Sequence, residues 1–170
     1  MKAEFCVLIK THFIMNKIFI LAIAVVVLCA CNFSKTEAQM NPLQDAKKAI
    51  AESNAIYFQS FIKNDSSIFI NRYAEDACIM APNAPKMCGR DEAAKFFRTA
   101  YDVYGMRSGK FITTNVYGDG IEFVTEEGLW QSFDVTGKLF DDGKFLVLWK
   151  KTKDGWKMYR DSFSSNRNSQ

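Results

Sequence analysis

The chain has 170 residues, which suits one domain of ordinary size behind a short leader. Its net charge is +3, and it falls to +1 without residues 1–30, which carry three lysines and one glutamate, so nothing electrostatic favours a nucleic-acid partner. The only histidine is His12, in the leader, which excludes Ser-His and Cys-His nucleophile pairs and imidazole metal sites from the rest. We therefore expect no metal and no cofactor, and a general acid or base must be Asp, Glu, Lys, Tyr or Cys.

An unbroken apolar run of 11 residues, Ile18–Leu28, opens the chain behind Lys17. A membrane span needs about 20 residues, so this run is instead typical of the apolar region of a signal peptide. It ends in Leu28-Cys29-Ala30-Cys31, which resembles a bacterial lipobox. The resemblance implies a lipoprotein signal peptide over residues 1–30 and a lipid on Cys31. An uncleaved anchor or a buried helix is the alternative.

The residues after Cys31 are polar and show no periodicity, so residues 31–42 are predicted to form a flexible tether. Asn32 follows the lipidated position, where an aspartate would favour retention in an inner membrane. We therefore expect the protein in the cell envelope, held by its lipid to the outer membrane and facing the periplasm.

Three helices are predicted in the first half of the folded part. Apolar residues recur at helical spacing for about 20 residues after Pro42, up to Ile62. A second, short helix is expected over Ile68–Tyr73, and a third opens at Gly89-Arg90 with acidic residues in its first turn. Between them, Ile79–Pro82 is predicted to be a strand, with Met87-Cys88 running back against it.

Everything from Lys110 onward is predicted to be antiparallel sheet. The expected strands are Phe111–Tyr117, Ile121–Val135, Phe145–Lys151 and Trp156–Ser164, with a longer connection over residues 137–143. Helices followed by a meander predict an α+β domain, in which a strongly curved sheet around the long helix would form a cone.

Five short runs then resemble a known family when they are taken together and in order. The runs are Tyr73–Ala77, Ile79–Asn83, Gly89-Arg90, Gly143–Lys150 and Asp154–Met158. They are similar to the SnoaL-like and ketosteroid-isomerase-like branch of the nuclear transport factor 2 superfamily, within its small bacterial domains of unknown function. The resemblance covers residues 43–165 and leaves residues 166–170 as a tail.

The resemblance implies a cone-shaped, curved antiparallel sheet wrapped around a long N-terminal helix, with two further helices. It also implies an apolar pocket at the open end and homodimers formed through the outer face of the sheet. Members of the superfamily include isomerases, dehydratases, cyclases and binding modules, so the fold does not decide the function.

The steroid-isomerase mechanism does not carry over to this chain. It needs a carboxylate base, a tyrosine and a second, protonated acid. Tyr57 matches the tyrosine, but Ala81 stands at the position of the base and Val147 at that of the second acid.

Two carboxylates are the substitutes that we consider. Asp161, on the last strand, is the first candidate and would act with Tyr57 in moving a proton; Glu127 is the second. Arg160 and Asn83 are weaker candidates. Strand alternation sends Asp161 and Arg160 to opposite faces unless a bulge intervenes. The alternatives are a structural acid paired with Arg160 or Arg90 for Asp161, an exposed strand charge for Glu127, and a core aromatic for Tyr57.

The predicted pocket is mostly aromatic, and core packing would explain its aromatic members equally well. Its residues are Tyr57, Phe61, Phe97, Tyr101, Glu127, Trp130 and Asp161.

Cys78 and Cys88 flank the first hairpin at a separation that can place them opposite each other. Export would permit a disulfide between them, and two buried free thiols are the alternative.

Two functions therefore remain open at this stage. We favour a non-catalytic module that binds a small apolar ligand or forms dimers in the cell envelope, because the catalytic set is incomplete. The alternative is a small enzyme that transfers protons on a carbonyl compound.

Overall fold

The computed structural model describes residues 41–167, so the predicted signal peptide, Cys31 and most of the tether lie outside the described residues. The described chain begins with helix α2 (Pro42–Lys63), which starts where Asn41 accepts a hydrogen bond of 3.0 Å from the amide of Leu43. It ends at Asn64, whose left-handed backbone (φ 51°) stops the helix. Its length agrees with the predicted periodicity. No helix among residues 41–167 combines the length and the hydropathy needed to cross a membrane.

Two further helices follow, separated by the first two strands. They are α3 (Ser66–Ile70) and α4 (Arg90–Arg98), and a π-helical turn, η1 (Thr99–Val103), continues α4. The strands between them are β1 (Tyr73–Met80) and β2 (Met87–Cys88). Tyr73 was predicted to end the second helix, but it begins β1. The cause is tertiary, because Tyr73 pairs with Met158 on the last strand.

Four long strands complete the sheet. They are β3 (Ser108–Gly118), β4 (Phe123–Phe133), β5 (Leu139–Thr152) and β6 (Gly155–Ser165). The connection predicted over residues 137–143 is shorter than expected, because Asp141 pairs with Ser132 of β4 inside the ladder. Its carboxylate accepts a hydrogen bond of 2.8 Å from Ser165, so an acidic residue is accommodated within the strand.

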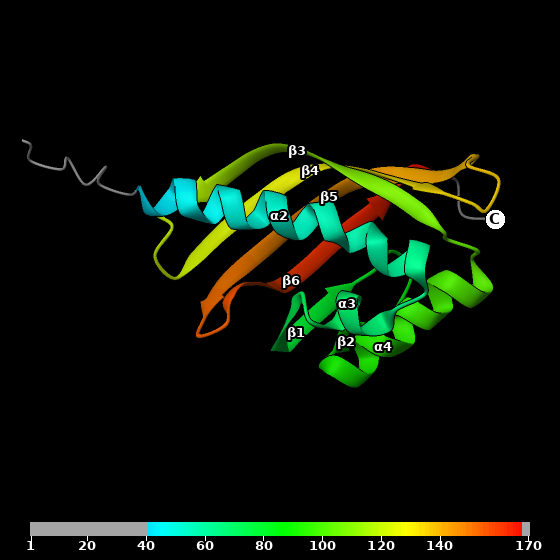
Figure 1. The fold of residues 1–170 in the computed structure, drawn as a ribbon, viewed down its shortest axis with the longest axis horizontal. Helices are drawn as coiled ribbons and strands as arrows, with labels where there is room; N and C mark the ends of the chain where they lie inside the picture. Colours follow the sequence, from blue (N-terminus) through cyan, green and yellow to red (C-terminus); the bar gives the residue numbers. More distant parts are fainter. Residues whose placement is uncertain (1–40, 168–170) are drawn as a thin grey trace, which may run out of the picture. The chain divides into compact units, whose positions relative to one another are not determined.

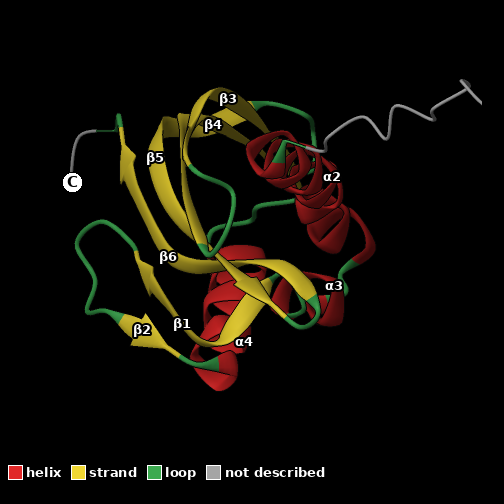
Figure 2. Ribbon diagram, turned by 90° about the vertical axis from the view of Figure 1, so that its left-hand side faces the viewer, coloured by secondary structure: helices red, strands yellow, loops and turns green. Residues whose placement is uncertain are grey.

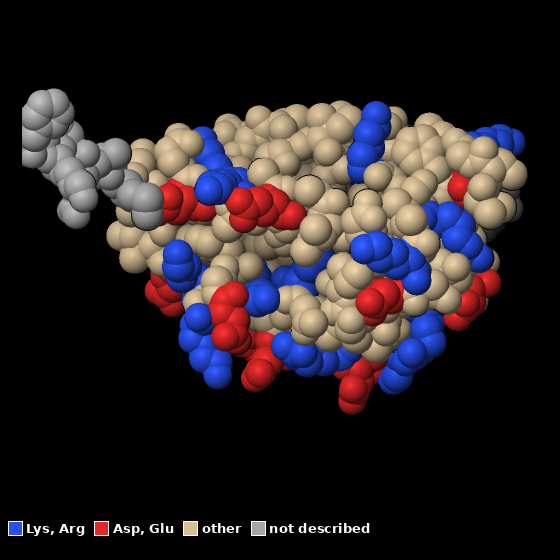
Figure 3. Space-filling model, in the orientation of Figure 1, with Lys and Arg blue, Asp and Glu red and all other residues tan. Residues whose placement is uncertain are grey.

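The sheet has the order β2-β1-β6-β5-β4-β3. It is mixed, not wholly antiparallel as predicted, because β1 runs parallel to β6. Figure 1 shows α2 lying across the long strands, and Figure 2 shows the sheet curving around the helices. The α+β cone with a long N-terminal helix and two further helices is thus confirmed. On the face drawn in Figure 3, basic and acidic side chains are interspersed.

The core fills the concave side of this sheet. Its largest fully buried side chains include Phe61, Phe69, Tyr73 and Trp149. Rings of α2, α3 and α4 contact one another here: the ring centroids of Phe61 and Phe97 lie 4.8 Å apart, and those of Phe61 and Phe69 lie 5.9 Å apart. This aromatic cluster fixes the helices against the sheet and leaves a hollow beside it.

Candidate functional site

A hollow of about 390 Å³ lies between α2, the α4–η1 helix and the concave face of the sheet. Its volume falls within the range of small-molecule sites, roughly 300–1,000 Å³. Most of its wall is apolar. Its aromatic side chains are Tyr57, Phe58, Phe96, Tyr104, Phe111, Trp130, Phe140, Phe145 and Phe163. Polar side chains also border it, including Tyr57, Lys95, Thr99, Ser132, Asp141, Asp161 and Arg167.

Asp161 lies on β6 and borders the hollow, with only 6% of its surface exposed. A β-bulge in β6 turns Asp161 toward the hollow. Leu148 of β5 pairs with Arg160 and the next residue, Trp149, pairs with Met158, so Tyr159 between them has no partner on β5. Trp156 and Met158 precede the bulge on the inner face, and Asp161 follows it on the same face. The bulge lies before Arg160, so Arg160 and Asp161 still point to opposite faces, as strand alternation predicted, and Asp161 is the one that faces inward.

Asp161 has a fixed partner on the neighbouring strand. The hydroxyl of Tyr73 donates a hydrogen bond of 2.6 Å to its Oδ2 atom, and among the described residues no donor lies on Oδ1. Burial raises the pKa of Asp161 to about 6, although the Tyr73 hydrogen bond and the positive charge of Arg72 oppose the shift. Near neutral pH the carboxyl group can therefore accept a hydrogen bond from a bound molecule or take up a proton.

Tyr57 of α2 also borders the hollow and is buried in the aromatic cluster. Its ring centroid lies 4.8 Å from that of Phe111, and the guanidinium carbon of Arg72 lies 4.9 Å from the ring centre. Burial and the nearby charge of Asp161 raise the pKa of Tyr57, so its hydroxyl stays protonated. Both alternatives drawn from the sequence therefore apply to Tyr57, which is a core aromatic and a wall residue at once.

A buried polar network lies behind Tyr57, and sequence reasoning missed its central residues, Arg72 and Glu126. Glu126 of β4 is 1% exposed and accepts hydrogen bonds from Asn54 (2.7 Å), Trp149 (3.0 Å) and Thr113. Arg72 donates to the side-chain oxygen of Asn54 at 3.3 Å. Burial raises the pKa of Glu126 and lowers that of Arg72 to about 10.

Glu127 was the second predicted carboxylate, and the structure corrects this choice. It lies on the outer face of the sheet, where it accepts a hydrogen bond of 2.7 Å from Tyr117. The inner residues of β4 are Val124, Glu126, Gly128 and Trp130, so the carboxylate inside the domain is Glu126. Alternation with the apolar Val124 and Trp130 is the sequence signal that could have found it.

Three predicted wall aromatics do not border the hollow. Phe61 and Phe97 belong to the aromatic cluster and are 0% and 2% exposed. Tyr101 lies against Arg107, whose guanidinium carbon is 3.7 Å from the ring centre. On α4 the wall residue is Phe96 instead. Tyr57, Trp130 and Asp161 do lie together around the hollow, as predicted.

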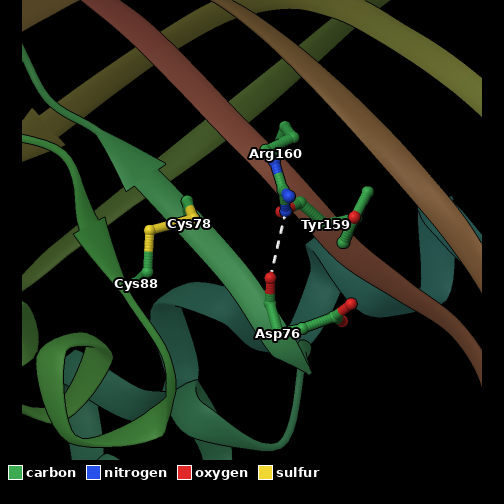
Figure 4. Close-up of a disulfide and its surroundings, with 5 residues drawn as sticks. All are labelled: Asp76, Cys78, Cys88, Tyr159 and Arg160. Atoms are coloured by element: carbon green, nitrogen blue, oxygen red, sulfur yellow. Dashed lines mark hydrogen bonds between the residues drawn. A yellow bond between two sulfur atoms is a disulfide. The ribbon is translucent and has the colours of Figure 1, made fainter.

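The weaker candidates and the cysteines are also placed by the structure. Arg160 points outward and donates a hydrogen bond of 3.0 Å to the backbone oxygen of Asp76 (Figure 4). Asn83 is exposed in the turn after β1. Cys78 and Cys88 form a disulfide across the β1–β2 pair, which decides between the bonded and free states left open above.

Two positions that carry acids in steroid isomerases are occupied by apolar residues in this chain. Ala81, at the position of the base, borders the hollow without a functional group. Val147, at the position of the second acid, pairs directly with Asp161 on the next strand. One carboxyl group therefore stands beside that position, with no base opposite it at Ala81. Among residues 41–167, no three His, Cys, Asp or Glu side chains gather to hold a metal.

Known structures share this fold at low sequence identity. A nuclear transport factor 2-like protein of unknown function from Shewanella oneidensis is 17% identical over 70% of this chain and 98% of its own, with a TM-score of 0.60. A ketosteroid isomerase-like protein from Erwinia carotovora atroseptica is 21% identical. The match covers 71% of this chain and 96% of that protein, with a TM-score of 0.55. A nuclear transport factor 2-like protein with a cystatin-like fold from Novosphingobium aromaticivorans is 16% identical. The match covers 81% of this chain and 92% of that protein, with a TM-score of 0.62.

No protein-family model and no curated protein matches the chain. The solved structures nevertheless agree on the architecture, and identities of this size establish the fold alone.

Proposed function

We propose that this nuclear transport factor 2-like domain binds a small, mainly apolar molecule that carries one hydrogen-bonding group. The observation that carries the proposal is Asp161. It is a nearly buried carboxylate on a mostly apolar wall, with Tyr73 on one oxygen and no donor from residues 41–167 on the other. A hydrogen bond inside a largely apolar site is stronger than one in water, so this carboxylate would fix the orientation of the guest. The aromatic walls would supply most of the affinity.

Binding of 1-naphthol and naphthalene tests this proposal, because the two compounds differ by one hydroxyl group. We expect the purified protein to bind 1-naphthol roughly tenfold more tightly, the value of about one good hydrogen bond to a charged group. In Asp161→Leu, which replaces the carboxylate by an apolar group, this preference should disappear. Isothermal titration or fluorescence provides the measurement.

Glu127→Leu is the matched control, because it removes a carboxylate of the opposite face and should keep the preference for 1-naphthol. Equal binding of the two compounds by the unaltered protein, or an undiminished preference in Asp161→Leu, would contradict the proposal.

The second candidate function is a proton-transfer enzyme acting on a carbonyl compound. It is favoured by one observation, the pKa of Asp161 of about 6 beside the hydroxyl of Tyr73. It is disfavoured by Ala81, which puts no carboxylate at the position of the steroid-isomerase base. Proton exchange or isomerisation of a bound ketone, abolished in Asp161→Asn, would favour the enzyme over the binding module.

We also propose that the protein is exported and anchored through a lipid on Cys31. Two independent features support this: the lipobox-like run Leu28-Cys29-Ala30-Cys31, and the disulfide between Cys78 and Cys88, a bond that persists in oxidising compartments. With Cys31→Ser, labelling by a radioactive fatty acid in a bacterial host should be lost and the protein should leave the membrane fraction. Cys29→Ser should retain both properties, and labelling that survives Cys31→Ser would contradict the proposal.

A further inference from the structure

One wall of the hollow is a short segment enclosed by the disulfide. Ala81, Pro82, Ala84 and Met87 border the hollow, and all four lie between Cys78 and Cys88. We call residues 81–87 the rim segment. Residues 81–86 of this segment form neither helix nor strand, and 83–86 are exposed.

Few noncovalent contacts of the backbone hold the rim segment to the sheet. Strand β2 has two residues, lies at the edge of the sheet, and pairs with β1 only through Cys78–Cys88 and Ile79–Met87. A hydrogen bond of 2.8 Å from the amide of Gly89 to the oxygen of Ala77 adds one contact. Such a short edge ladder opens easily, so the disulfide is the main link that keeps the segment closed.

The same bond links two walls of the hollow. Helix α4 begins at Arg90, two residues after Cys88, and supplies Phe96 to the wall of the hollow, while η1 supplies Ala100. Figure 4 shows the disulfide joining β1 and β2 at the edge of the sheet. Its two cysteines differ in exposure, because Cys78 is 5% exposed whereas Cys88 is an exposed residue. We therefore expect a thiolate in solution to reach Cys88 more readily than Cys78.

We propose that this disulfide controls how long the hollow retains its ligand, an inference that rests on the proposed binding function. A dithiol reductant attacks the Cys88 sulfur, the sulfur–sulfur bond breaks, and Cys78 leaves as a thiolate that takes up a proton. The second thiol of the reductant then releases Cys88 as a thiol and becomes a cyclic disulfide, so two electrons pass to the protein. The freed rim segment opens, and the ligand leaves faster.

The experiment measures the dissociation rate of 1-naphthol by stopped-flow fluorescence, with the folded protein before and after treatment with dithiothreitol. We expect reduction to raise the dissociation rate roughly tenfold, since changes at a site appear mainly in this rate. The double variant Cys78→Ala/Cys88→Ala should dissociate at the fast rate with or without dithiothreitol. Amide hydrogen exchange should become faster in the rim segment on reduction and stay unchanged in β4 and β5.

The outcomes separate this inference from the proposed function. Oxidised protein that binds 1-naphthol and releases it at the same rate after reduction overturns the inference alone. Oxidised protein that does not bind 1-naphthol overturns both. If the double variant does not fold, the dissociation rate of the reduced, unaltered protein still tests the inference. Slow hydrogen exchange in β4 and β5 then shows that the reduced domain is intact.

Discussion

Replacing Glu126 by alanine should lower the free energy of unfolding by about 2–3 kcal/mol, because the buried indole N–H of Trp149 and the half-buried amide of Asn54 would lose their acceptor. Asn54, Thr113 and Trp149 all donate to this carboxylate, and it is 1% exposed. The indole N–H of Trp149 would stay unpaired because Trp149 is fully buried, whereas the exposed Thr113 can pair with water. Urea unfolding followed by circular dichroism gives the measurement.

The neighbouring Glu127→Ala supplies the matched control. Its carboxylate makes one hydrogen bond, to Tyr117 on the exposed side of the sheet, so its loss should change stability by no more than about 0.5 kcal/mol. Equal losses in the two variants would show that the buried network does not contribute as described. The comparison also tests, by stability alone, which of the two glutamates lies inside the domain.

The stability of the protein should fall as the pH rises from about 4 to 7, and Asp161 should cause much of that fall. Its pKa is raised from 3.8 to about 6 in the folded chain, so the folded state holds the proton more tightly than the unfolded state does. The stabilisation is therefore fully present below pH 3.8 and is lost as the pH rises through 6. A shift of this size corresponds to roughly 2–3 kcal/mol.

Asp161→Asn should flatten this part of the pH profile, because an amide does not titrate and can still accept the hydrogen bond from Tyr73. Urea unfolding at several pH values, for this variant and for Glu127→Gln, provides the comparison. Glu127→Gln should follow the unaltered protein. The raised pKa of Glu126 acts in the same direction in every variant and cancels in the difference. Parallel profiles for Asp161→Asn and the unaltered protein would contradict the assignment.

Local patterns predicted the fold well where neighbours in sequence determine the structure. The helix over Pro42–Lys63 follows from apolar spacing, and the hairpin at Lys153–Gly155 follows from its turn residues. Prediction failed where distant segments decide. Tyr73 belongs to a strand because β6 lies beside it, and Asp141 belongs to a strand because Ser165 satisfies its carboxylate.

The site was predictable in part for the same reason. Tyr57 and Asp161 could be chosen as residues of one hollow from the resemblance and from residue type. Arg72 and Tyr73 could not, because their roles depend on the parallel pairing of β1 with β6, which leaves no local signal. Glu126 was within reach of strand alternation, whereas the one-residue bulge at Tyr159 was not, because nothing near it marks the extra residue.

The bulge at Tyr159 also affects how the last strand can be aligned with that of other proteins. In a relative whose β6 is regular, the residue in the column of Asp161 faces outward, and the inward position is the column of Arg160. An ungapped alignment would therefore equate residues from opposite faces of the sheet. It would look for a counterpart of Asp161 at an outward position instead of the inward one. Columns on this strand become comparable only after a one-residue gap is set opposite Tyr159.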